Sequence, residues 1–153
     1  MDNLQEIRTY ASSLGLIHTK NGLETLIHTA ETGESSYVTF LQDVLGSEIR
    51  YRQDKAKEKR IKEAGFPYPK YLKDFDLSFC QSITKKQLNQ LSELTWIDGL
   101  YNLILSGPPG VGKTHMAIAL AYHACEEGYK ASYTTMQSLM QCLRTCEIDR
   151  RSK

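Results

Sequence analysis

The chain has 153 residues, of which 41% are hydrophobic and 24% are charged, and its formal net charge is +1. This composition is that of a globular protein, and the length allows one ordinary domain or two small ones. The near-neutral balance excludes a strong overall field for nucleic acid or membranes, so any such binding must come from local patches. No apolar run reaches the ~18 residues of a membrane span, and the first residues lack the apolar block of a signal peptide. We therefore expect a cytoplasmic protein.

Residues 1–65 are predicted to form a small helical domain. Apolar residues at helical spacing predict a first helix that ends at Gly15. A second, short helix is expected from Asn21 to about Gly33, and a third, longer helix begins at Ser35 or Ser36. The apolar stripe of the third helix comprises Tyr37, Phe40, Leu41, Val44, Leu45 and Ile49.

The third predicted helix becomes strongly basic after Ile49 and ends at Gly65. Its cationic residues are Arg50, Arg52, Lys55, Lys57, Lys59, Arg60 and Lys62. Acidic residues in the same stretch (Asp54, Glu58 and Glu63) favour a solvated helix with i,i+4 ion pairs. The same cations would also suit the phosphate backbone of DNA. The segment itself does not decide between these interpretations.

Residues 66–84 form a predicted linker, because Pro67 and Pro69 exclude a regular helix. We expect its aromatic residues to pack against the next domain, although a stacking platform for single-stranded nucleic acid is an alternative. These aromatic residues are Phe66, Tyr68, Tyr71, Phe75 and Phe79. A helix that closes at Gly99 follows, with Leu88, Leu91, Leu94 and Ile97 at helical spacing.

The most specific motif is the Walker A pattern G-x-x-x-x-G-K-[ST] of phosphate-binding loops. Its residues are Gly107, Pro108, Pro109, Gly110, Val111, Gly112, Lys113 and Thr114. The short apolar run Leu103–Leu105 precedes the motif and suits a buried parallel strand. A helical face follows it, formed by Met116, Ala117, Leu120, Ala121 and Ala124. Strand, glycine loop and helix in this order are the context that the motif requires.

Each residue type in the motif has a physical role. Glycines allow backbone conformations that are closed to larger residues, and the helix that opens near Lys113 directs its positive end at phosphates. Lys113 would contact the β- and γ-phosphates, and the Thr114 hydroxyl would bind Mg²⁺. The sequence thus predicts a nucleotide phosphate site with Thr114 as its metal ligand.

Beyond the loop helix, residues 129–133 alternate as a second strand would, and a last helix is expected to begin near Thr135. The apolar face of this helix comprises Met136, Leu139, Met140 and Leu143. The four cysteines lack the spacing of a zinc site, so we interpret them as reduced thiols.

The chain resembles the IstB-like ATP-binding proteins, helper ATPases of bacterial insertion-sequence transposition that are related to DnaC-like helicase loaders within the AAA+ class. The resemblance rests on "FPYPKYLKDFDLSF", "LNQLSELTWI" and "NLILSGPPGVGKTHMAIALAYHACEEGYKASYTTMQSLM". It implies an α/β P-loop NTPase core of the AAA+ type with an incomplete parallel sheet, preceded by a small all-α domain. The implied domains are residues 1–65, a linker at 66–84, and the first part of the ATPase domain at 85–153.

The resemblance also implies ATP and Mg²⁺ as ligands, self-association, and a helper that binds DNA and directs a transposase. The family's water-activating acid, its polar sensor and its cross-subunit arginine come after the second strand, and no residue of this chain matches them. We therefore expect a truncated family member, deficient in hydrolysis, with no catalytic residue of its own. In the family's sheet order, the strand at 103–105 would have no neighbour, which predicts either a marginal fold or a pairing of the two strands that differs from the family's.

Three other interpretations stay open. A DnaC-like replicative helicase loader would have the same fold but a different partner. Alternatively, residues 1–65 could be a DNA- or protein-binding module attached to an inert remnant of the loop. A small phosphotransferase is disfavoured, because such enzymes usually begin near the loop strand.

Overall fold

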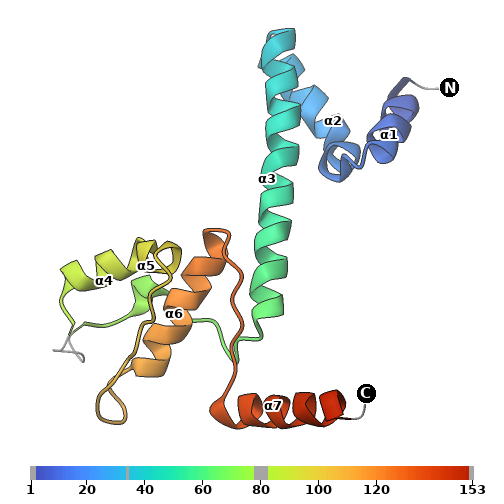
Figure 1. Cartoon of the computed structure of the whole chain (residues 1–153). Helices are drawn as coiled ribbons and strands as arrows, with labels where there is room; N and C mark the ends of the chain where they lie inside the picture. Colours follow the sequence, from blue (N-terminus) through green and yellow to red (C-terminus); the bar gives the residue numbers. More distant parts are fainter. Residues whose placement is uncertain (1–2, 34, 78–82, 152–153) are drawn as a thin grey trace. The chain divides into compact units, whose positions relative to one another are not determined.

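The computed structural model describes residues 3–33, 35–77 and 83–151. The chain divides into two compact units, residues 1–56 and 57–153. Every regular element of the described residues is helical (Figure 1). These elements are α1 (Asn3–Ser13), α2 (Ile17–Thr32), α3 (Tyr37–Ala64), the 3-10 helix η1 (Leu72–Asp74), α4 (Lys85–Ser92), α5 (Thr95–Asp98), α6 (Lys113–Glu126) and α7 (Met136–Arg151). None of the helices in the described ranges is long and apolar enough to cross a membrane.

A buried carboxylate connects α2 and α3 in the first unit. Glu48 of α3 is 3% exposed, and it accepts hydrogen bonds from the backbone N–H (3.0 Å) and the hydroxyl (3.3 Å) of Thr19 in α2. Arg52 donates to its second carboxylate oxygen at 3.3 Å. Burial by itself would raise the pKa of Glu48, but these hydrogen bonds together lower it below the ordinary value. Glu48 is therefore ionised and paired in the folded unit.

The helix boundaries agree with the sequence prediction in part. Ser36 caps α3 as predicted, since its hydroxyl accepts from the N–H of Thr39 at 3.2 Å. The prediction that the second helix starts at Asn21 was wrong, because α2 already begins at Ile17. The predicted apolar stripe of α3 is only partly covered: Phe40 and Val44 are half-buried, whereas Tyr37, Leu41, Leu45 and Ile49 are more than half exposed.

The second unit is built around α6. Its buried apolar residues are Ala64, Leu94, Met116, Ile118, Ala119, Leu120, Ala124 and Cys125. Helix α4 packs on α6, and it begins with a capping box in which Thr84 accepts from the N–H of Gln87. The single helix predicted to close at Gly99 is broken into α4 and α5 at Leu94. Leu94 is buried in the left-handed conformation, with φ of 59°.

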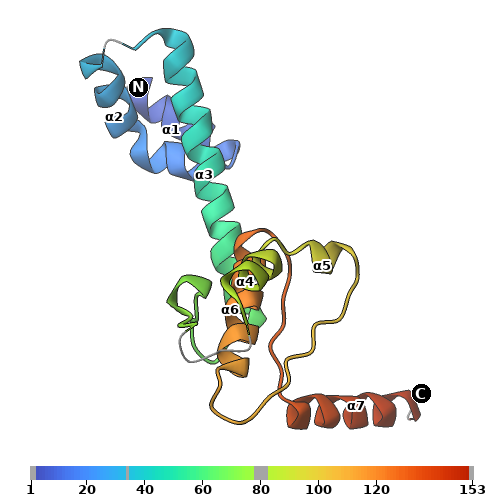
Figure 2. The ribbon, with the colours of Figure 1, turned by 90° about the vertical axis from the view of Figure 1, so that its left-hand side faces the viewer.

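The predicted parallel sheet is absent from the described residues, and the α/β fold class was therefore wrong. Residues 101–107 and 129–135 are irregular, and the stretch between α5 and α6 runs as an open loop in both views (Figures 1 and 2). Ile104, expected in a buried strand, is 84% exposed. A strand is stable only when a neighbour satisfies its backbone groups, and these two segments do not pair with each other. The N–H of Tyr133 instead donates to the carbonyl of Ala64 at 2.8 Å.

Helix α7 begins where the sequence predicted. The hydroxyl of Thr135 accepts from the N–H of Ser138 at 3.1 Å. The apolar face of the helix is exposed by 41% to 73% at Met136, Leu139, Met140 and Leu143.

Within the described ranges, no cluster of three or more histidine, cysteine, aspartate or glutamate residues could hold a metal ion. Cys80 and Phe79 lie outside those ranges.

Candidate functional site

The glycine loop, Gly107–Thr114, leads directly into the first turn of α6. Its three glycines have positive φ angles: 153° at Gly107, 84° at Gly110 and 87° at Gly112. A side chain at any of these positions would be strained, which explains why the loop uses glycine. Because α6 begins at Lys113, the positive end of its dipole and its free N–H groups lie at the end of the loop.

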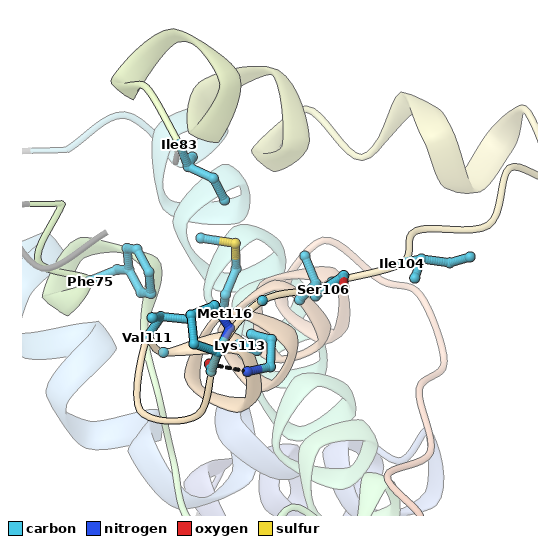
Figure 3. Close-up of a pocket in the computed structure, with 11 residues that line it drawn as sticks. Phe75, Ile83, Ile104, Ser106, Val111, Lys113 and Met116 are labelled. Carbon is cyan, nitrogen blue, oxygen red and sulfur yellow. Dashed lines mark hydrogen bonds between the residues drawn. The ribbon is translucent and has the colours of Figure 1, made fainter. Parts of the chain in front are cut away.

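Lys113 and Thr114, the two polar residues of the motif, occupy the first turn of α6. The Lys113 ammonium folds back across the loop and donates to the Pro108 carbonyl at 2.5 Å, as the dashed line in Figure 3 shows. Thr114 is exposed. Both groups are thus at the mouth of the loop, where an anion could replace the Pro108 carbonyl as the partner of Lys113.

A hollow of about 280 Å³ lies beside the loop. It is lined by Phe75, Ile83, Ile104, Leu105, Ser106, Gly107, Pro108, Val111, Gly112, Lys113 and Met116. In Figure 3 the Phe75 ring lies beside Val111 of the loop, and the Ile83 side chain lies above Met116. No carboxylate is among these lining residues of the described chain. The hollow therefore combines one polar wall, the glycine loop, with an apolar wall.

Phe75 is in close contact with the loop. A Cβ atom placed on Gly112 would lie 3.2 Å from the Phe75 ring, so only glycine fits under that ring without a shift. The other side of the contact is His115, whose ring meets Phe75 edge-on with centroids 5.4 Å apart. The Nε2 atom of His115 is buried and has no hydrogen-bond partner among the described residues. Phe75 thus fixes the linker to the start of α6.

The rest of the linker runs along α6. Tyr71 meets Tyr122 edge-on with ring centroids 4.9 Å apart, and Phe66 lies 6.0 Å from the same ring. The hydrogen bond with Tyr71, together with burial, raises the pKa of Tyr122 to about 12. These contacts show the predicted packing of linker aromatics, here against α6 within the second unit. Tyr68 is an exception, because it is 44% exposed and carries the Lys70 ammonium over its ring.

Two of the basic residues of α3 contact α6. The Lys57 ammonium lies 2.6 Å from the Glu126 carboxylate, and Arg60 Nε donates to the Cys125 carbonyl at 3.0 Å. Both acceptors are in the last turn of α6. These two cations therefore hold one helix against another.

The other basic residues of α3 are exposed. Lys59 makes an i,i+4 ion pair of the kind that the sequence favours, with Glu63 at 3.8 Å, whereas Arg52 pairs with the buried Glu48 at 3.3 Å, an acid that precedes the predicted stretch. Lys55 lies over the ring of Tyr51 on its own helix. Arg50 and Lys62 complete the set of exposed cations. The ion-pair interpretation is thus correct for part of the helix, and Arg50, Lys55 and Lys62 are exposed beside these pairs.

Comparison with known proteins decides the family. The family model of IstB-like ATP-binding proteins of the IS21 type matches residues 9–153. The chain belongs to this IstB-like family. An IS21-like insertion-sequence ATP-binding protein from Bacteroides fragilis is 34% identical over 144 residues. A second one, from Bacteroides fragilis strain YCH46, is 36% identical over 146 residues, and an IS21 ATP-binding protein from Pseudomonas aeruginosa is 33% identical over 148 residues.

The chain spans only part of the length of these IstB-like relatives. The alignments cover 94%, 95% and 97% of this chain, but 55%, 73% and 56% of the respective relatives. The family match includes the glycine loop, the linker and the basic part of α3. The sequence pattern identified the loop residues but not Phe75 and Ile83 as its neighbours. The only signal for them was the aromatic and apolar character of the linker.

Proposed function

We propose that this IstB-like chain binds Mg-ATP through its glycine loop and acts as a helper in insertion-sequence transposition. The observation that carries the proposal is the loop itself, with positive φ at Gly107, Gly110 and Gly112 and a helix that starts at Lys113. This arrangement presents backbone N–H groups and a positive helix end to phosphate. The family's description as ATP-binding selects the nucleotide.

The chain's residues fit the groups of a nucleoside triphosphate. Lys113 would exchange the Pro108 carbonyl for β- and γ-phosphate oxygens, which are better acceptors because they are charged. The apolar wall of the hollow, which includes Phe75 and Ile83, suits a base or ribose. The Thr114 hydroxyl is exposed in the first turn of α6 and can serve as the single protein ligand that Mg²⁺ needs beside phosphates and water. When bound, the ion would neutralise phosphate charge.

We also propose that the chain by itself hydrolyses ATP poorly. Activation of an attacking water needs a positioned base or a water-orienting group. The described residues that line the hollow include no carboxylate, histidine or glutamine. Lys113, the loop amides and Thr114 can hold the phosphates, but they do not remove a proton from water.

The partners that we propose are DNA, a transposase and further copies of the chain. DNA contact is supported by the exposed cations of α3, namely Arg50, Arg52, Lys55, Lys59 and Lys62. Such contacts predict that log Kd changes steeply with log salt. Transposase and self-association are proposed from the family and its insertion-sequence relatives. Co-purification with a replicative helicase rather than a transposase would favour the DnaC-like alternative.

A thermal melt tests the proposal. Mg-ATP at ~100 times its dissociation constant should add ~2.7 kcal/mol to the free energy of unfolding. For a domain of 60–100 residues this corresponds to a shift of roughly 10–20 °C in Tm, and to less if the two units melt together. We expect the shift in the unmodified chain and not in Lys113→Ala. An equal shift in both proteins, or none in either, would contradict nucleotide binding by the loop.

A further inference from the structure

The carboxyl end of α6 is held by two basic residues that share one face of α3. Lys57 and Arg60 are three positions apart, so their side chains leave the helix on the same side. The Lys57 ammonium pairs with Glu126, the last residue of α6, and Arg60 donates to the carbonyl of Cys125. The last carbonyls of a helix lack intrahelical partners and carry the negative end of its dipole. The Cys125 carbonyl also accepts the N–H of Gly128 at 3.3 Å, so Arg60 adds a charged donor to it, and both cations lie at the negative end of the helix.

The surroundings make this contact specific. Cys125 is fully buried, so its carbonyl belongs to a residue of the core rather than to a mobile surface. Glu126 and Lys57 are 30% and 39% exposed, which shields their ion pair from solvent in part. On the same helix, the His123 Nε2–H donates to the Ser92 carbonyl of α4 at 3.0 Å. The end of α6 is therefore fixed to α3 and α4 through named polar contacts.

The opposite end of α6 carries the glycine loop. A helix of 14 residues is rigid over its length of about 21 Å, so a change at its last turn moves or loosens its first turn. The linker strengthens this connection, since it follows Ala64 of α3 and reaches the first turn of α6 at Phe75. Both ends of α6 are thus positioned from α3.

We propose that Lys57 and Arg60 are positioning residues of the nucleotide site: they hold α6, and with it the glycine loop, in the geometry that binds phosphate. The inference rests on the proposed function. It excludes two of the seven basic residues of α3 from the proposed DNA contact. A DNA phosphate that bound Lys57 or Arg60 would have to displace Glu126 or the Cys125 carbonyl. Lys59 and Lys62 are exposed and make neither contact with α6.

A charge exchange tests the inference on the whole chain. The variants are Lys57→Glu, Glu126→Lys and the double variant Lys57→Glu/Glu126→Lys, which restores the pair with the charges reversed. Lys59→Glu is the matched control, because it makes the same charge change on the same helix. The Kd for Mg-ATP is measured at a temperature at which circular dichroism shows every protein to be folded. Binding of duplex DNA is measured in parallel as a function of salt.

We expect each single variant to raise the Kd for Mg-ATP about three- to tenfold, the double variant to return it to within about twofold, and Lys59→Glu to leave it unchanged. Lys59→Glu, in contrast, should weaken DNA binding and reduce its salt dependence. An unchanged Kd in Lys57→Glu, or no recovery in the double variant, would overturn the inference while nucleotide binding stands. If the unmodified chain shows no binding that depends on Lys113, the proposed function fails, and the inference fails with it.

Discussion

Substitution of Gly112 by alanine should damage the loop more than the same change at Gly110. Both glycines have φ near 85°, at 87° and 84°, so alanine costs about 1–2 kcal/mol of backbone strain at each position. The surroundings differ. A Cβ atom at Gly110 meets no atom within 4 Å, whereas at Gly112 it lies 3.2 Å and 3.5 Å from two atoms of the Phe75 ring. The ring must shift by a few tenths of an ångström from its place, and a side chain forced about 30° off its rotamer costs about 0.5–1.5 kcal/mol, which we take as the range of the added cost.

Thermal denaturation followed by circular dichroism measures this difference. A loss of 1 kcal/mol lowers Tm by roughly 4–8 °C in a domain of 60–100 residues, so an added cost of about 0.5–1.5 kcal/mol should make Gly112→Ala melt about 2–12 °C below Gly110→Ala. In a Phe75→Ala background the gap should close, because the ring that Cβ meets has been removed. Equal Tm values for the two alanine variants, or a gap that persists without Phe75, would refute the contact between linker and loop.

Three further changes test other parts of the structure. Glu48→Gln should lower the free energy of unfolding at pH 7 by about 1–3 kcal/mol. Because the folded pKa of Glu48 lies below its ordinary value of 4.5, its contribution is complete above that value and is lost as the pH falls through the folded pKa. Urea denaturation should therefore show that the difference in free energy of unfolding between the unmodified chain and Glu48→Gln becomes smaller below pH 4.5. A difference that stays constant with pH would contradict this. Thr84→Ala should lower the free energy of unfolding by ~1 kcal/mol, because α4 loses its N-cap. Urea denaturation measures this loss, with Ser92→Ala as the control, since the Ser92 hydroxyl donates to the Asn89 carbonyl and caps no helix start. In the presence of EDTA, Thr114→Ala should bind ATP with the affinity of the unmodified chain. Mg²⁺ should raise the affinity of the unmodified chain for ATP but not that of Thr114→Ala. If calorimetry shows the same increase in both proteins, Thr114 is not the metal ligand.

The sequence predicted those parts of the structure that local physics determines. The glycine loop, the start of α6 at Lys113 and the caps at Ser36 and Thr135 depend on neighbours within a few residues. Packing of the linker aromatics was also predictable, because prolines exclude a helix while large apolar rings favour burial. The partners of those rings, Tyr122 and His115, could not be read from the pattern.

The sheet was the main error, and its cause is non-local. Residues 103–105 and 129–133 have the composition of strands, but a strand also needs a neighbour with free backbone groups. The described residues supply none, and the N–H of Tyr133 pairs with the end of α3. The break between α4 and α5 has a similar origin. Leu94 is 2% exposed, and its burial outweighs the strain of its left-handed conformation.

The most direct test of the account is titration calorimetry of Mg-ATP into the unmodified chain and into Lys113→Ala. The loop geometry predicts one nucleotide bound for each chain in the first protein and no measurable binding in the second, with both proteins folded by circular dichroism. Binding of equal affinity in the two proteins would place the nucleotide elsewhere. No binding to a folded, unmodified chain would contradict the claim that this loop holds phosphate.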